Sequence, residues 1–341
     1  MKANKNNMRR GGIVAPTRRS FLMAATAAAV IPAGRPFAQT VKRLRYAHSA
    51  PATHGWHLWG VQFKTALEKK TSGAMQVTLF PNAQMGTERD IAQAVRLGSL
   101  EMGAVGVALM NWVPEMSVTD APFLFKNRKQ AYGALDGELG AELKRRSLAQ
   151  GFIIAGWNDL GMRCMTNSKH PIHTAQDMGD LKMRVPPSKS YIAMMKAMGS
   201  TIVTVDLSEL YLALSQHVAD GQDTPPSVVK SNKYYEVQKF LSKTEHVMTN
   251  AYSIMNPQAF NALSKDEQAA VTAASDEATI WLRDFTQKDE LDAYEFLRSK
   301  GMTVDMSPDI ASFQAATAEV ITSLPDLFHP DLVKLARSAS A

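Results

Sequence analysis

The feature that most constrains the fold of this sequence is a stretch of 36 residues, 265–300, that contains neither glycine nor proline. Ser264 and Glu267 have the spacing of a capping box, in which both side chains satisfy free amides at a helix start, and Gly301 supplies the stop. At about 1.5 Å per residue such a helix is roughly 50 Å long. The stretch therefore predicts a helix that bridges two domains; a helix broken near its middle, with no bridging role, is the alternative.

Before this stretch, short apolar segments alternate with helical patterns in two successive series. Strands are expected at residues 44–47, 76–80, 102–109, 152–155, 162–166, 181–185 and 202–205. Helices are expected along the apolar face of Trp56, Trp59, Phe63 and Leu67, at 87–97 before Gly98, at 191–198, after Ser208 and from about Ser227. This alternation is typical of α/β domains with largely parallel sheets, and the length of the chain suggests two of them.

The first 38 residues differ from the rest, because they hold seven basic residues and no acidic one. The mainly apolar run at 21–31 is too short for a membrane-spanning helix, which needs about 20 apolar residues. A basic region, a short apolar run and small residues before a cut predict a signal peptide at 1–38, cleaved after Ala38. The segment Thr-Arg-Arg-Ser-Phe-Leu at 17–22 resembles the twin-arginine signal. An ordinary Sec leader is the alternative, and either route predicts a periplasmic protein.

The net charge and the cysteine content limit which binding partners and cross-links this protein can have. The whole chain carries 38 Lys and Arg against 32 Asp and Glu. Without the seven basic residues of the leader, 31 basic residues face 32 acidic ones, so the mature net charge is near −1. We therefore expect no nucleic-acid and no anionic-membrane partner. The single cysteine, Cys164, cannot form an internal disulfide.

The middle third contains motifs that are specific in their order. They are Gly161-Met162-Arg163, Pro171-Ile172, Asp177, Leu181-Lys182-Met183-Arg184-Val185-Pro186, Gly199, Ser208-Glu209-Leu210-Tyr211-Leu212-Ala213-Leu214, Asp220-Gly221-Gln222-Asp223-Thr224-Pro225, Tyr234-Tyr235-Glu236-Val237-Gln238-Lys239-Phe240 and Thr244-Glu245-His246. Earlier segments agree, namely Phe80-Pro81, Gln84-Met85-Gly86-Thr87-Glu88-Arg89-Asp90 and Ala121-Pro122-Phe123-Leu124-Phe125. Over residues 42 to about 300 the chain resembles the substrate-binding subunit of tripartite ATP-independent periplasmic (TRAP) transporters, the DctP-like family.

The resemblance implies an α/β, two-lobed periplasmic binding protein fold with a long helix spanning both lobes. We expect residues 39–160 and 250–289 in lobe I, and residues 161–249 and 290–341 in lobe II. It also implies a protein that captures a small carboxylate-containing organic acid and delivers it to the small and large membrane subunits of a TRAP transporter. A monomer is the default expectation.

The resemblance further assigns ligand-binding residues. Arg184 is expected to hold the ligand carboxylate, with Arg163 as a second anion contact and Thr224 where relatives commonly carry Asn. His48 and Glu88 map to other ligand-contacting positions. Arg suits this role because its planar fork donates two parallel hydrogen bonds to a carboxylate. Leu207 and Trp157 are added as apolar residues near the cleft, and they favour a smaller or partly apolar acid.

Structural alternatives exist for these residues. Arg184 could form a structural salt bridge to Asp177 or Asp180, and Thr224 could cap a helix. Trp157 could be plain core. The histidines at 48, 54 and 57 suggest a metal site, but their spacing matches no closed site and neither cysteine nor paired carboxylates accompany them. We therefore expect no metal and no cofactor.

Catalytic motifs are scarce in this sequence. It has no G-x-S-x-G elbow, no H-E-x-x-H, no glycine-rich phosphate loop and no C-x-x-C. Cys164 lies between two methionines, which favours an inert thiol. No catalytic residue is expected. A binding protein for an ATP-driven transporter or a sensor kinase, and a periplasmic enzyme acting on an organic acid, are the alternative functions.

Overall fold

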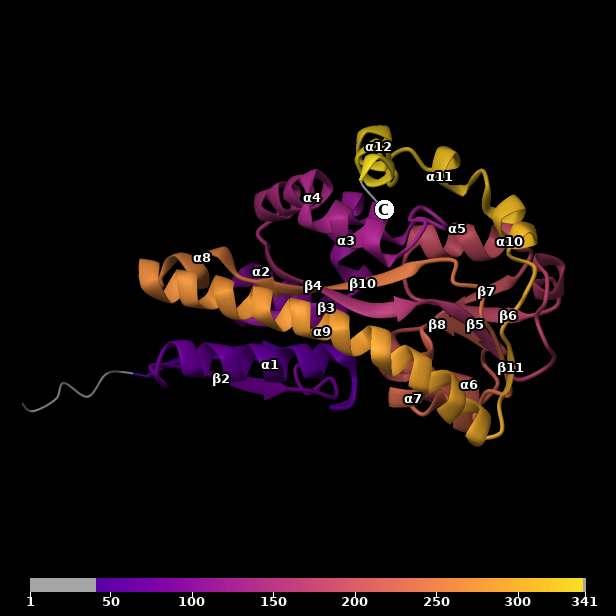
Figure 1. Cartoon of the computed structure of the whole chain (residues 1–341), viewed down its shortest axis with the longest axis horizontal. Coiled ribbons are helices and arrows are strands. Elements are labelled where there is room, and N and C mark those ends of the chain that lie inside the picture. Colours follow the sequence, from indigo (N-terminus) through magenta and orange to yellow (C-terminus); the bar gives the residue numbers. More distant parts are fainter. Residues whose placement is uncertain (1–40, 340–341) are drawn as a thin grey trace, which may run out of the picture. The chain divides into compact units, whose positions relative to one another are not determined.

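The computed structural model describes residues 41–339, so the predicted signal peptide lies outside the described residues. The fold is α/β, as expected, with two mixed sheets (Figure 1). The first sheet has the order β2-β1-β3-β10-β4. Its strands are β1 (Lys42–Ala47), β2 (Met75–Phe80), β3 (Met102–Val105), β4 (Ile153–Met162) and β10 (Met248–Met255). Only β10 runs antiparallel to its neighbours in this sheet.

We call the first sheet and the helices packed around it the first half of the molecule, and the second sheet with its helices the second half. The helices of the first half begin and end at recognisable sequence signals. They are α1 (Gly55–Lys70), α2 (Glu88–Leu97), α3 (Arg128–Asp136), α4 (Glu138–Ala149) and α8 (Pro257–Asn261). The predicted apolar stripe of α1 is buried. The Thr87 hydroxyl accepts a hydrogen bond from the Asp90 amide at the start of α2, and Gly98 ends the helix with φ +77°. That left-handed conformation favours glycine.

The second sheet has the order β11-β9-β5-β8-β6-β7. Its strands are β5 (Cys164–Asn167), β6 (Lys182–Val185), β7 (Thr201–Thr204), β8 (Gly221–Thr224), β9 (Phe240–Ser242) and β11 (Thr303–Asp305). Strand β5 is antiparallel to both of its neighbours, β8 and β9. The later helices are α5 (Lys189–Ala197), α6 (Leu210–Ser215), α7 (Pro226–Ser231), α10 (Ile310–Thr317), α11 (Val320–Ser323) and α12 (Pro330–Ser338).

The long helix is confirmed as α9 (Lys265–Ser299), an unbroken helix of 35 residues with the predicted Ser264–Glu267 capping box. At about 1.5 Å per residue it is roughly 50 Å long. It packs on α1 and β4 of the first half and on α7 and β11 of the second (Figure 1). The chain also crosses between the sheets from β4 to β5 and from β9 to β10.

Three predicted elements differ from the structure. The strand expected at 102–109 ends at Val105, and a 3-10 helix, Val107–Asn111, follows it. The strand expected at 152–155 continues to Met162 as β4, and a new strand starts only at Cys164. After Asp206 comes a 3-10 turn and then α6, with no side-chain cap from Ser208. The first two differences concern how far an apolar segment continues as a strand, which depends on pairing with other strands and not on local periodicity.

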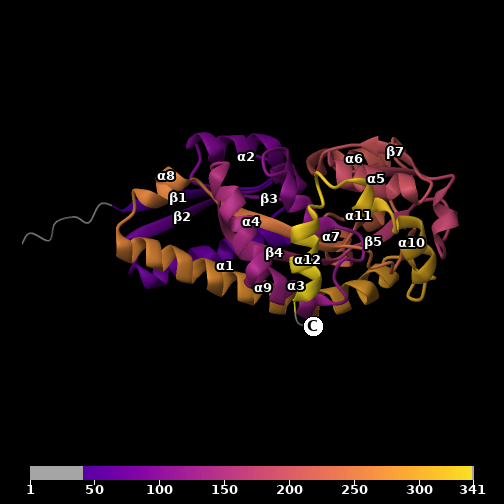
Figure 2. The same ribbon diagram turned by 90° about the horizontal axis from the view of Figure 1, so that it is seen from above.

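The C-terminal helix corrects part of the predicted lobe assignment. Residues 290–341 were expected in lobe II, but α12 packs on α3 and α4, which belong to the first half (Figure 2). Leu332 and Ala336 are fully buried in the same apolar cluster as Leu139 and Leu143 of α4. The amphipathic face of α12 therefore returns the chain to the first half.

None of the helices within residues 41–339 is long and apolar enough to cross a membrane.

Candidate functional site

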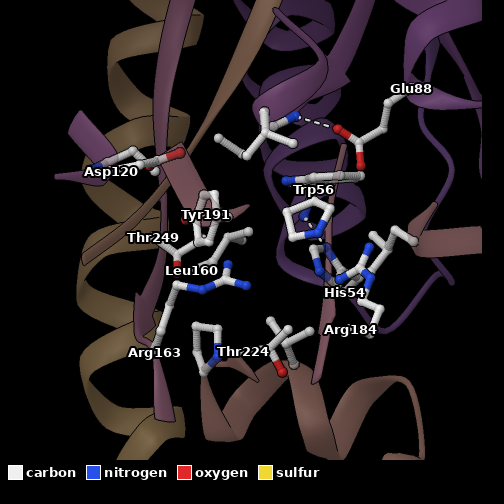
Figure 3. Close-up of a pocket in the computed structure, with 18 residues that line it drawn as sticks. His54, Trp56, Glu88, Asp120, Leu160, Arg163, Arg184, Tyr191, Thr224 and Thr249 are labelled. Carbon is white, nitrogen blue, oxygen red and sulfur yellow. Dashed lines mark hydrogen bonds between the residues drawn. The ribbon is translucent and has the colours of Figure 1, made fainter. Parts of the chain in front are cut away.

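A small cavity collects polar side chains from both sheets and from the helices beside them (Figure 3). Its volume is about 60 Å³. Its polar and aromatic lining comprises His54, Trp56, Glu88, Asp120, Arg163, Arg184, Tyr191, Thr224, Thr249 and Asn250. Five residues predicted from the sequence are among the lining: Arg184, Arg163, Thr224, Glu88 and Leu207.

Arg184 is the penultimate residue of β6, two positions before Pro186, and only 2% of it is exposed. Its Nε donates a hydrogen bond to the Val205 carbonyl at 2.8 Å. The remaining guanidinium N–H groups have no hydrogen-bond or ion-pair partner among residues 41–339 and face the cavity. Burial lowers the pKa of Arg184 from its ordinary value. Burying an arginine without a counter-ion costs free energy. An anion bound beside Arg184 would lower this cost.

The structural alternative for Arg184 does not hold. The Asp177 carboxylate accepts hydrogen bonds from the His173 and Thr174 amides, and Asp180 pairs with His170 at 2.9 Å. Both carboxylates therefore have other partners, and neither forms a salt bridge with Arg184 in the part of the chain that the structure describes.

Arg163, between β4 and β5, differs from Arg184 because its charge is compensated. Its Nε lies 2.6 Å from Asp223 Oδ2, and both side chains are buried. His246 Nε2 contacts the same carboxylate oxygen at 3.1 Å, and the Tyr191 ring lies 4.6 Å from the guanidinium carbon. Burial opposes the charge of Arg163, but Asp223, Tyr191 and Asp120 together outweigh it and raise the pKa of the guanidinium. Arg163 is thus a paired cation at the wall of the cavity.

Two carboxyl groups also line the cavity. Glu88, the first residue of α2, accepts a hydrogen bond from the Gly106 amide at 2.7 Å. Burial raises the pKa of Glu88 to about 7, although that amide and Arg184 oppose the shift. Burial likewise raises the pKa of Asp120 to about 7 against the effect of Arg163. Figure 3 shows Asp120 on the same side as Arg163, and Glu88 on the same side as Arg184.

Thr224 ends β8 and is 4% exposed, and its hydroxyl has no hydrogen-bond partner within the described residues. It is not a helix cap, because Pro225 occupies the N-cap position of α7 without a side-chain bond. The Thr249 hydroxyl on β10 is buried and unpartnered in the same way. Both residues line the cavity, so their hydroxyls are free to bind a polar guest.

Two predicted residues lie elsewhere. His48 is fully buried, with its Nε2 3.2 Å from His57 Nδ1. Burial, and then His57, lowers the pKa of His48 to about 3. Trp157, on β4, packs edge-to-face on Tyr252 in the core, with ring centroids 5.8 Å apart. Neither residue is among the lining of this cavity, and their predicted role in ligand binding stays a prediction.

The sequence also left residues unrecognised. His54 and Trp56 line the cavity in place of His48 and Trp157. Asp120 directly precedes the Ala121–Phe125 motif, and that adjacency was its only sequence signal. Tyr191 was recognised only as part of a helix. Within residues 41–339 no group of three His, Cys, Asp or Glu side chains is placed to hold a metal ion.

Cys164 does not have the setting of a nucleophile. It is buried, its Sγ lies 3.4 Å from the Tyr294 hydroxyl, and burial raises the pKa of the thiol to about 12. A thiol with so high a pKa holds almost no thiolate at neutral pH.

The chain forms two α/β halves, connected where it passes from one sheet to the other, and both halves line a cavity that contains the unpaired Arg184. This arrangement is typical of the solute-binding proteins of transport systems. The chain belongs to the bacterial extracellular solute-binding proteins of family 7, the DctP family, which it matches over residues 46–325. It is a transport binding protein and not an enzyme, which removes the predicted enzyme alternative. A solute-binding protein of Verminephrobacter eiseniae is 37% identical over 279 residues, 81% of this chain and 83% of that one.

Solved structures agree with this assignment. A TRAP periplasmic solute-binding protein from Polaromonas sp. JS666, bound to D-erythronate, is 30% identical with a TM-score of 0.85 over 88% of this chain and 99% of that chain. A TRAP periplasmic solute-binding protein from Bordetella, with density interpreted as pantoate, is 28% identical with a TM-score of 0.84 over 88% and 100% of the two chains. The predicted two-lobed fold is confirmed by these likenesses.

Proposed function

We propose that this protein binds a small organic acid in the described cavity, with Arg184 holding the ligand carboxylate. The observation that carries the proposal is the buried guanidinium of Arg184, whose free N–H groups face the cavity. A carboxylate there supplies the missing counter-charge and accepts two parallel hydrogen bonds. Hydrogen bonds to charged groups contribute about 1.5–3 kcal/mol each. The remaining lining, with Thr224, Glu88 and Leu207, fixes the rest of the ligand.

The bound acids of similar proteins support this ligand class. Besides the erythronate and pantoate complexes, a sugar acid binding protein of Advenella mimigardefordensis is in complex with galactonate at 27% identity and a TM-score of 0.84 over 88% of this chain and 99% of that chain. Each of these ligands is a hydroxylated acid with one carboxylate. The proposal transfers to this chain the carboxylate that these ligands share.

The transport role has a location and partners. The protein acts in the periplasm after removal of residues 1–38, and it delivers its ligand to the small and large membrane subunits of a TRAP transporter. Support comes from the basic, short-cored leader in the sequence and from similarity to TRAP binding proteins. Uptake of the labelled acid in cells that carry both membrane subunits, with and without this protein, tests the delivery step. ATP-independent uptake that requires this protein is expected.

The binding step is tested with a thermal-shift screen of residues 39–341 against organic acids, repeated on Arg184→Ala. A ligand at 100 times its Kd stabilises by about 2.7 kcal/mol, which moves Tm by several degrees. Loss of two charge-assisted hydrogen bonds should weaken the affinity of Arg184→Ala at least tenfold. Arg145→Ala is the matched control, because the Arg145 side chain is 70% exposed and pairs only with Glu142. An equal response of both variants would refute the anchor.

A further inference from the structure

The charge inventory of the cavity limits it to one ligand carboxylate. Two arginines line it, but Arg163 is already bound to Asp223 at 2.6 Å, with both side chains buried. The Asp223 main-chain carbonyl accepts a second hydrogen bond from the same guanidinium. Arg184, in contrast, forms no salt bridge with any acidic side chain in residues 41–339, so its charge is the one that remains uncompensated among the two. One carboxylate therefore satisfies the cationic demand of the site.

The rest of the polar lining is acidic or neutral. Glu88 and Asp120 present carboxyl groups, while Thr224 and Thr249 present hydroxyls without partners among the described residues. Carboxyl and hydroxyl oxygens accept hydrogen bonds from ligand hydroxyls. A second ligand carboxylate would instead lie beside two acids of like charge in a buried space, where unpaired charge is strongly unfavourable. The same groups thus attract hydroxyls and repel a second anion.

We infer that the site selects a short hydroxylated monocarboxylic acid over a dicarboxylic acid, and that Glu88 and Asp120 are the residues that determine this choice. The inference rests on the proposed function, in which Arg184 binds the first carboxylate. The cavity volume of about 60 Å³ favours a short ligand. Buried polar groups that need a hydroxyl partner discriminate strongly against a ligand that lacks one.

Erythronate and succinate make a matched pair of probes, because both have four carbons and differ in hydroxyls against a second carboxylate. Titration calorimetry at pH 8 compares the two, with pantoate and galactonate as further hydroxylated monocarboxylates. The tightest hydroxylated monocarboxylate is expected to bind at least tenfold more tightly than succinate. Equal or tighter binding of succinate overturns the inference and leaves the proposed function intact. No binding of any acid overturns the proposed function itself.

The variants Glu88→Gln and Asp120→Asn test the two residues with near-identical shapes. Each is expected to tighten succinate binding more than hydroxy-acid binding, so that their affinity ratio falls at least threefold. Asp180→Asn is the control, because the Asp180 carboxyl is exposed and pairs with His170 outside the cavity. An unchanged ratio in both cavity variants overturns the assignment of these residues. The wild-type comparison needs no variant and decides the selectivity even where a variant fails to fold.

Discussion

Arg128 and Arg184 differ in one respect, which is whether acidic side chains of the chain pair with the guanidinium. At the end of β4, Arg128 lies 3.4 Å from Asp159 and also pairs with Glu290 of α9. The Glu290 carboxylate also accepts a hydrogen bond from the Met162 amide at 3.1 Å. In the cavity, Arg184 has no acidic partner among residues 41–339.

This difference in charge pairing predicts a structural role for Arg128 and a ligand-binding role for Arg184. In the Arg128 cluster the chain supplies both signs of charge, so the cluster joins β4 to the long helix without any guest. At Arg184 the chain supplies one sign, and under the proposed function a ligand carboxylate supplies the other. We call these the paired cluster (Arg128, Asp159, Glu290) and the open cation (Arg184). Loss of the first should reduce stability, and loss of the second should reduce affinity.

The largest expected effect is on the paired cluster. Glu290→Ala leaves Arg128 and the Met162 amide without a main partner in a buried place, and breaking a buried ion pair costs about 3–5 kcal/mol. Because the Arg128 side chain is 20% exposed, we expect the low end, about 3 kcal/mol, in urea unfolding. Glu295→Ala on the same helix is the control, since that side chain is 76% exposed and should change stability by less than about 0.5 kcal/mol. Equal losses in both variants would remove the distinction between the clusters.

A smaller effect of the opposite sign is expected at the open cation. Arg184→Met keeps the apolar stem and removes a buried charge that has no partner, so the ligand-free protein should become more stable by about 1 kcal/mol. The measurement is urea unfolding without ligand, beside a ligand titration that should show lost affinity. A stability loss of more than about 2 kcal/mol would assign Arg184 to the fold instead.

The smallest effect concerns pH. The pKa of Glu88 is about 7 in the protein without ligand, and its charged neighbours are Arg184 and Asp206. A ligand carboxylate on Arg184 adds negative charge beside Glu88 and raises this pKa further, so the protonated form binds the ligand better. Affinity for a hydroxylated monocarboxylate should therefore fall severalfold as pH rises from 6 to 8.5. Calorimetry checks this; Glu88→Gln should flatten the profile, and an affinity that rises with pH would contradict it.

The sequence predicted most elements and the open cation, for identifiable reasons. Helix α9 was predictable because its cap, its length and its stop are local signals in residues 264–301. Arg184 was predictable because it lies near the end of an apolar strand before two prolines inside a recognised motif.

Other parts depend on contacts between distant residues. The position of Trp157 outside the cavity lining could not be predicted, because the side to which it points depends on how far β4 extends and on its register with Tyr252 of β10. Asp120 was missed because nothing in its own segment indicates that the fold brings it near Arg163. His48 and His54 are close in sequence, and only the packing of α1 decides which of them reaches the cavity.

The continuity of α9 has a mechanical consequence. Sharp helix bends arise at proline, at glycine and serine pairs, or at bulges, and residues 265–299 contain no glycine or proline and form one regular helix. Helix α9 is therefore expected to move as one rigid element that packs on both halves. A rearrangement that opens the cavity is therefore expected to change the backbone at the crossings near residues 163 and 247 and in the segment between α10 and α12, because α9 has no sequence feature that favours a bend.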